Sequence, residues 1–309
     1  MLGVAAASAV AGAAALGVPA TPARAASMRR GGEDTGPVPT PIPEQVKATE
    51  GMAPVGDARL WYWDTGGSGA PIVLFHPFTG SGRVWSYQQP VFARAGYRVI
   101  GYSRRGFERS ESGPKDKPGT GSADLHALLD FLKVDRFHAV STAGGAFVAA
   151  DYALSHPERL QSLVLACSIL GASGGEFAKM SSGLRPPGFN EMPEHFKELS
   201  PSYRAADLEG TERWKALQST STSPETRVQQ TYANKMTLER LPELKMPTLL
   251  LAGGADLIAP PPIVRLFAKY IPGSELVVIP EAGHSAYWER PELFNRAVLD
   301  FVGRHRGRK

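Results

Sequence analysis

Cysteine is almost absent from this sequence, since Cys167 is the only one in 309 residues. One thiol cannot form an intramolecular disulfide, so a disulfide framework is excluded and cysteine usage says nothing about the compartment. Cys167 stands in the apolar run "SLVLACS", which favours a place in the core.

A strong charge imbalance is also missing, because 34 basic residues stand against 30 acidic ones and the formal net charge is +4. The basic residues are scattered, apart from the terminal "RHRGRK", which is typical of a solvated tail. We therefore expect no nucleic-acid partner. The sequence also contains no P-loop, dinucleotide fingerprint or cluster of metal ligands, so we expect no cofactor and no metal.

Charged residues are missing from the first 23 positions, an Ala- and Gly-rich run that ends in Ala23-Arg24-Ala25. This small-x-small pattern predicts an export signal over residues 1–25, cleaved near Ala26, and a periplasmic or secreted protein. "MLG" resembles the end of a twin-arginine box, which suggests a true start further upstream. A membrane anchor is the alternative, but Ala and Gly partition weakly into lipid, so we expect no stable membrane association.

Short apolar runs alternate with helical stretches in the rest of the chain. Runs such as "PIVLFH", "SLVLACS" and "TLLLAGG" are apolar throughout, as expected for strands covered on both faces. "GSADLHALLDFLKV" and "GGAFVAADYALSHP" have the periodicity of helices. The pattern predicts an α/β fold with a doubly wound, mostly parallel sheet. We expect a linker over 26–55, a core from 56–170 and 247–309, and a helical cap inserted at 171–246.

Four motifs at strand ends occur in an order that resembles the α/β-hydrolase superfamily, from about 58 to 303. They are "HPFTGSGRVW", "YALSHPERLQSLVLA", "GGADLIAP" and "PEAGHSAYWERPELFN". The resemblance implies the α/β-hydrolase fold and hydrolase activity on a small-molecule substrate. Asp256 and His284 then match the acid and the histidine, since a buried carboxylate fixes the histidine tautomer and stabilises its cation.

The resemblance also implies an oxyanion hole formed by the backbone amides of Phe78 and Gly144. Two positions depart from the family pattern. Pro77 stands where relatives usually carry glycine and has no N–H to offer, and Ser103 stands where relatives commonly show aspartate.

The nucleophile is the largest departure, because "HAVSTAGGAF" has no serine in the expected register. The family pattern is small-x-nucleophile-x-small, and three residues compete for the apex: Ser141, Thr142 and Ala143. In relatives the proline of "YALSHPERL" lies fourteen residues after the nucleophile, and counting back from Pro157 favours Ala143. Thr142 would place a β-branched residue at positive φ, which is strained.

Three functions remain open at this stage. The first is an exported enzyme that hydrolyses a small ester or lactone, or performs lyase-type chemistry, with a His-Asp dyad and no serine nucleophile. The second is a conventional acyl hydrolase that uses Thr142 or Ser141. The third is a ligand-binding protein that has lost its chemistry. Retention of both Asp256 and His284 favours an enzyme.

Overall fold

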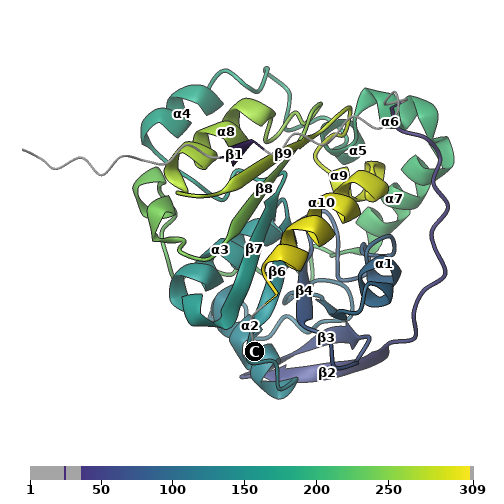
Figure 1. Cartoon of the computed structure of the whole chain (residues 1–309), viewed down its shortest axis with the longest axis vertical. Helices are drawn as coiled ribbons and strands as arrows, with labels where there is room; N and C mark the ends of the chain where they lie inside the picture. Colours follow the sequence, from purple (N-terminus) through teal and green to yellow (C-terminus); the bar gives the residue numbers. More distant parts are fainter. Residues whose placement is uncertain (1–23, 26–35, 307–309) are drawn as a thin grey trace, which may run out of the picture.

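A nine-stranded sheet crosses the molecule in the order β1-β9-β8-β7-β6-β4-β5-β3-β2 (Figure 1). The structure is a computed structural model, and it describes residues 24–25 and 36–306. The strands are β1 (Arg24–Ala25), β2 (Thr49–Val55), β3 (Ala58–Asp64), β4 (Pro71–Phe75), β5 (Arg98–Tyr102), β6 (Phe137–Thr142), β7 (Leu160–Ala166), β8 (Thr248–Gly253) and β9 (Glu275–Ile279). The β2–β3 and β3–β5 pairs are antiparallel and the others are parallel. The predicted α/β class with a doubly wound, mostly parallel sheet is confirmed.

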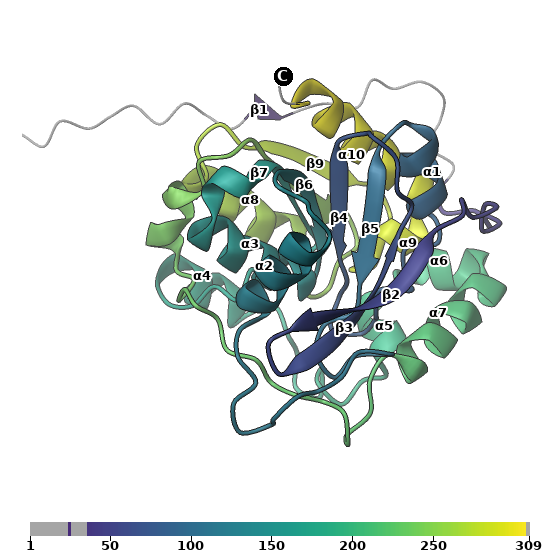
Figure 2. The same cartoon turned by 90° about the horizontal axis from the view of Figure 1, so that it is seen from below.

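Helices cover both faces of this sheet, which explains why its central strands are apolar throughout (Figure 2). Every residue of β6 and of β8 is buried. One face is covered by α2 (Gly121–Phe131), α3 (Gly145–Ser155) and α8 (Pro261–Tyr270). The other is covered by α1 (Gln89–Arg94), α9 (Ala286–Glu289) and α10 (Pro291–Arg304).

Helix α3 lies against the sheet through a stripe of alanines. Ala146, Ala149, Ala150 and Ala153 have no exposed surface. Their small side chains let the helix axis approach the strands closely, so the start of α3 is held tightly beside the end of β6. The helix ends at Ser155, and the short 3-10 helix η1 (Pro157–Arg159) follows.

The predicted linker over 26–55 is wrong at its C-terminal end, because β2 begins at Thr49. This strand pairs with β3 from Thr49–Asp64 to Val55–Ala58 around a tight turn at Gly56, whose φ is 66°. The sequence of β2 gives little indication of a strand. Its first two residues are exposed, so the apolar alternation that is typical of a strand is weak. Residues 26–35 of the predicted linker and 1–23 of the predicted signal lie outside the described residues.

A long insertion separates β7 from β8. It contains α4 (Gly175–Ser181), α5 (Glu194–Glu198), α6 (Pro201–Ala206), α7 (Leu208–Thr220) and the 3-10 helix η2 (Leu238–Glu243). Side chains of this insertion and side chains from the carboxyl ends of the strands line one cavity, so the insertion covers the site described below. In the part of the chain that the structure describes, no helix is both long and apolar enough to cross a membrane.

Candidate active site

Ala143 occupies the turn between β6 and α3 in a left-handed conformation, with φ of 49°. Its N–H donates to the Ala166 carbonyl at 2.9 Å, and its carbonyl accepts from the Ser168 hydroxyl at 2.8 Å. Ala166 is the last residue of β7 and Ser168 lies just after it, so the neighbouring strand and the loop that follows it hold the turn in place. Of the three candidate apex residues, Ala143 is the one that the structure places at positive φ.

The residues around this turn are small because the backbone is crowded. A side chain at Gly145 would collide with the Phe75 carbonyl oxygen at the end of β4. One at Gly144 would collide with the Phe78 ring, which lies directly over it. This crowding is the physical basis of the small-x-apex-x-small pattern, and Ser141 and Gly145 are the flanks when Ala143 is the apex.

Ser141 and Thr142 do not line the cavity that Ala143 lines. Both residues are fully buried in β6. The Ser141 hydroxyl donates to the Val164 carbonyl of β7. The Thr142 hydroxyl has no hydrogen-bond partner among the described residues, and neither residue lines the cavity. The structure therefore brings neither hydroxyl to the place where a nucleophile would act.

His284 and Asp256 meet at the carboxyl end of the sheet, from the loops that follow β9 and β8. The imidazole Nδ1 lies 2.9 Å from Asp256 Oδ2 and 3.1 Å from Oδ1. The amides of Ile258 and Ala259 donate to Oδ1 of the carboxylate at 2.7 and 2.9 Å, which fixes its orientation. This geometry leaves Nε2 as the nitrogen available for proton transfer.

His284 is a stronger base than an ordinary histidine. Burial would by itself lower its pKa, but the negative charges of Asp256 and then Glu198 outweigh burial and raise the pKa to about 9. The Asp256 hydrogen bond acts in the same direction. The imidazole therefore carries a proton at neutral pH and becomes a general base as the pH rises.

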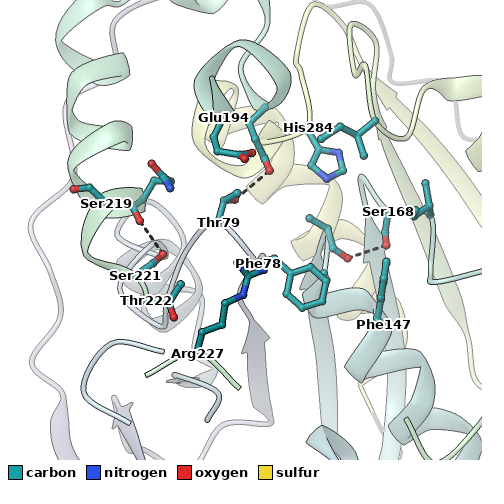
Figure 3. A pocket seen from close by; sticks show the side chains of 16 residues that line it. Phe78, Thr79, Phe147, Ser168, Glu194, Ser219, Ser221, Thr222, Arg227 and His284 are labelled. Carbon is teal, nitrogen blue, oxygen red and sulfur yellow. Dashed lines mark hydrogen bonds between the residues drawn. The ribbon is translucent and has the colours of Figure 1, made fainter. Parts of the chain in front are cut away.

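Glu198, at the end of α5, is a site residue that the sequence did not indicate. It is 5% exposed, and it lines the cavity together with His284. Its Oε1 accepts from the Thr79 hydroxyl at 3.1 Å, which is the bond drawn from Thr79 in Figure 3. Its Oε2 accepts from the Ser285 hydroxyl at 3.2 Å. Burial raises the pKa of this carboxyl above its usual value. No motif marks a glutamate in a polar insertion, and only the folded cap brings it to the dyad.

Glu289 is a second buried carboxyl that binds the loop that carries His284. It is 1% exposed and accepts from the Gly283 amide at 3.0 Å and the Ser200 amide at 2.9 Å. Burial raises the pKa of Glu289 to about 7. One buried carboxyl thus ties the loop that carries His284 to the start of α6 in the insertion.

His284 and the turn at Ala143 line one cavity of about 380 Å³. Figure 3 shows His284 and Phe78 on its wall. Phe78, Ala143, Gly144 and His284 all line it. The backbone amides of Phe78 and Gly144 donate no hydrogen bond within the described chain. The Pro77 carbonyl accepts from Arg104 at 3.0 Å and from the His76 ring at 2.8 Å, so the loop before Phe78 is held firmly although Pro77 has no N–H.

The sequence matches the alpha/beta hydrolase fold family over residues 70–291. The chain belongs to this family. It is 32% identical over 281 residues to a 2-hydroxy-6-oxononadienedioate/2-hydroxy-6-oxononatrienedioate hydrolase of Paraburkholderia phymatum, and the match covers 80% of this chain and 92% of that protein. The chain is an α/β-hydrolase-type enzyme.

Two solved structures show the same fold at similar coverage. A thermophilic esterase from Thermogutta terrifontis with malate bound has a TM-score of 0.69 and 26% identity, over 84% of this chain and all of that one. An N-acyl homoserine lactone degrading enzyme has a TM-score of 0.65 and 28% identity, over 82% of this chain and all of that one. In residues 24–25 and 36–306 of this chain, no group of three or more His, Cys, Asp or Glu is placed to hold a metal ion.

Proposed function

We propose that this α/β-hydrolase hydrolyses a small ester or lactone by direct attack of water, without a covalent acyl-enzyme. One observation carries the proposal: the turn that should hold the nucleophile holds the methyl group of Ala143, while an oriented histidine faces the same cavity. A site with a base but no acyl acceptor can still activate water.

In the proposed mechanism, Nε2 of neutral His284 removes a proton from a water molecule in the cavity. The water oxygen attacks the substrate carbonyl carbon, and the negative charge that develops on the carbonyl oxygen is stabilised by the Phe78 and Gly144 amides. The tetrahedral intermediate then collapses, the bond to the leaving alkoxide breaks, and imidazolium returns its proton to that alkoxide. Asp256 stabilises the imidazolium between the two proton transfers.

Ester and lactone substrates are also favoured by two of the solved structures with the same fold. The two similar structures named above are an esterase and a lactone degrading enzyme. Lyase-type proton abstraction by His284 would use the same base, but no observation in the structure favours it over hydrolysis.

The test is a panel of aryl esters and lactones assayed with the wild-type enzyme. We expect steady turnover without a burst, and intact-mass spectrometry during turnover should show no acyl adduct, because Ala143 offers no acceptor. An adduct mapped to Thr142 or Ser141 would restore the conventional mechanism. Absence of turnover with every substrate would favour the ligand-binding alternative.

We also propose that the protein is exported, with residues 1–25 removed as a twin-arginine type signal. Cleavage near Ala26 would remove Arg24 and Ala25, which form β1 beside β9, and would leave eight strands in the mature sheet. Mass spectrometry of exported protein should find the mature N-terminus near Ala26, and recovery of the intact leader in a membrane fraction would support an anchor.

The charge of Glu198 is expected to set the pH at which the enzyme works. When ionised, Glu198 stabilises the His284 imidazolium and so raises its pKa. The base must be neutral, so activity rises with pH through the His284 pKa. Glu198→Gln removes this stabilisation, and the rising limb of kcat/KM should move to lower pH by about one unit or more. Glu191→Gln, an exposed change on the same insertion, is the matched control; an unmoved limb in Glu198→Gln would refute the electrostatic role.

A further inference from the structure

Arg104, which follows β5, is a buried cation without an acidic partner in the described chain. It is 6% exposed, and its guanidinium lies 4.7 Å from the centroid of the Phe78 ring and 4.6 Å from that of Phe107. Its hydrogen bonds go to the His76 ring and to the carbonyl oxygens of His76 and Pro77. These are neutral acceptors, and a buried charge without a counter-charge is costly.

The described chain offers Arg104 aromatic rings and neutral acceptors but no counter-charge. Burial and then the charge of Arg104 lower the pKa of His76 well below its usual value, so this ring is neutral. Burial lowers the pKa of Arg104 itself to about 10, which still leaves it protonated at neutral pH. The next residue is the contrast: Arg105 binds Asp124 through Nε at 2.7 Å and also pairs with Asp57. Both arginines are buried, but only Arg105 has carboxylates.

Arg104 lines a cavity and has one side-chain donor that is free in the described chain. Its Nε and Nη2 make the hydrogen bonds described above, whereas its Nη1 donates to no group in the described chain. The guanidinium lines a cavity of about 470 Å³ together with Phe107, Arg227 and Tyr232. A guanidinium edge that opens into a cavity is suited to bind a carboxylate.

This second cavity adjoins the one that holds His284. Phe78, Phe147 and Arg227 line both of them. The Phe78 and Phe147 rings meet edge to face, with their centroids 5.6 Å apart, and contribute to the walls of both cavities. Arg227 is exposed and points toward Phe78, and its side chain forms no ion pair within the described residues (Figure 3). A second cation therefore stands at the junction of the two cavities.

We propose that the Arg104 cavity binds a carboxylate carried by the substrate, so that the enzyme prefers esters or lactones with a free acid group beyond the scissile carbonyl. The scissile carbonyl of the substrate would lie beside His284, and the hydrocarbon part of the substrate would pass Phe78. The distal carboxylate would then bind Arg104 and Arg227. This preference rests on the proposed hydrolysis, whereas carboxylate binding at Arg104 does not.

A carboxylate fits this cavity better than a phosphate. One buried guanidinium edge matches one monoanion, and the aromatic walls formed by Phe78, Phe107 and Phe147 suit a hydrocarbon chain. A dianionic phosphate would need several further donors. Inorganic phosphate is therefore the discriminating probe.

The first experiment compares two substrates that differ in one charge: a mono-aryl ester of glutaric acid, and the same aryl ester with the distal acid methylated. In the wild type we expect kcat/KM to be about 10- to 100-fold higher for the free acid, since a hydrogen bond to a charged group is strong. Arg104→Gln should bring this ratio close to one. The ratio is read within each variant, so any general damage from loss of the Pro77 contact affects both substrates alike.

Three further variants keep the test decisive if Arg104→Gln folds poorly. Arg104→Lys keeps the charge but not the planar fork, so part of the preference should remain. Arg227→Gln should reduce the ratio by a few fold, because an exposed cation contributes less. Arg109→Gln is the control, since that exposed arginine pairs with Glu50 away from both cavities, and the ratio should not change. Equal ratios in the wild type, Arg104→Gln and Arg227→Gln would overturn the proposal.

The second experiment needs no turnover. Calorimetric titration with succinate, glutarate and adipate should show binding in the wild type that weakens about 10-fold or more in Arg104→Gln. Dicarboxylate binding that depends on Arg104, without hydrolysis of any ester, would support the carboxylate site and reject the proposed function. Hydrolysis of both esters at equal rates, without dicarboxylate binding, would support the proposed hydrolysis and reject the carboxylate site. Binding of inorganic phosphate as tight as that of glutarate would refute the assignment to carboxylates.

Discussion

His284→Ala is expected to lower kcat/KM by about 10²- to 10⁴-fold for any substrate that the wild type hydrolyses, which is the range for loss of a general base. The imidazole lines the cavity and is positioned by a buried carboxylate, through the 2.9 Å bond to Asp256. Steady-state kinetics at a pH above 9, where most of the wild-type base is neutral, is the measurement. Ligand binding should change little, because the substitution removes a reacting group and leaves the other walls of the cavity in place.

Asp256→Asn is the partner experiment. Asparagine keeps the size of the side chain but cannot stabilise the imidazolium, and it can hold the ring in the wrong tautomer, so a loss of similar size is expected. His195→Ala serves as the control, because that partly exposed histidine lies on the insertion between β7 and β8 and does not line the cavity. Turnover that survives in both His284→Ala and Asp256→Asn would exclude the dyad from the chemistry.

Ala143→Ser should create an enzyme that forms an acyl intermediate. The new hydroxyl would stand at the apex of the turn, on the wall of the cavity that His284 also lines. Serine meets the same backbone strain as alanine at φ of 49°, so the turn should persist. An activated aryl ester should then release its first equivalent of phenol in a burst, and intact mass should rise by one acyl group on residue 143. The wild type should show neither.

Thr142→Val and Ser141→Ala are the matched controls for that gain. Both hydroxyls are buried within β6 and lie outside the cavity, so wild-type turnover should be largely retained in each. Loss of turnover by about 10³-fold in Thr142→Val would show that threonine is the nucleophile and that Ala143 is not the functional apex.

The local sequence predicted the strands and helices of the core because their signals are local. Buried parallel strands need unbroken apolar runs, and the alanine stripe of α3 appears at helical spacing. The same is true of Asp256 and His284, which follow strands whose carboxyl ends meet at one edge of the sheet. β2 was missed because an edge strand with exposed residues carries little hydrophobic signal, and its partner β3 stabilises it.

The turn at Ala143 shows where sequence and structure contribute separately. The residues "STAGG" restricted the apex to three candidates, and spacing to Pro157 favoured one of them. Only the backbone conformation shows which residue takes positive φ, because that angle depends on how β6, β7 and α3 are packed around the turn. The same packing buries the Ser141 and Thr142 hydroxyls outside the cavity and leaves Ala143 on its wall.

Glu198 and Arg104 belong wholly to the tertiary structure. Glu198 is 86 positions away from His284 in the sequence. Arg104 stands beside a second arginine of the same residue type and charge, so the local sequence does not tell their environments apart. Burial of Glu198 against the dyad and the lack of a carboxylate beside Arg104 follow from how the insertion and the loops fold over the sheet. The type and charge of each residue can be read from the amino-acid sequence. Desolvation and the choice of interaction partner arise only when distant segments pack together. These two effects set the pKa of His284 and form the proposed carboxylate site at Arg104.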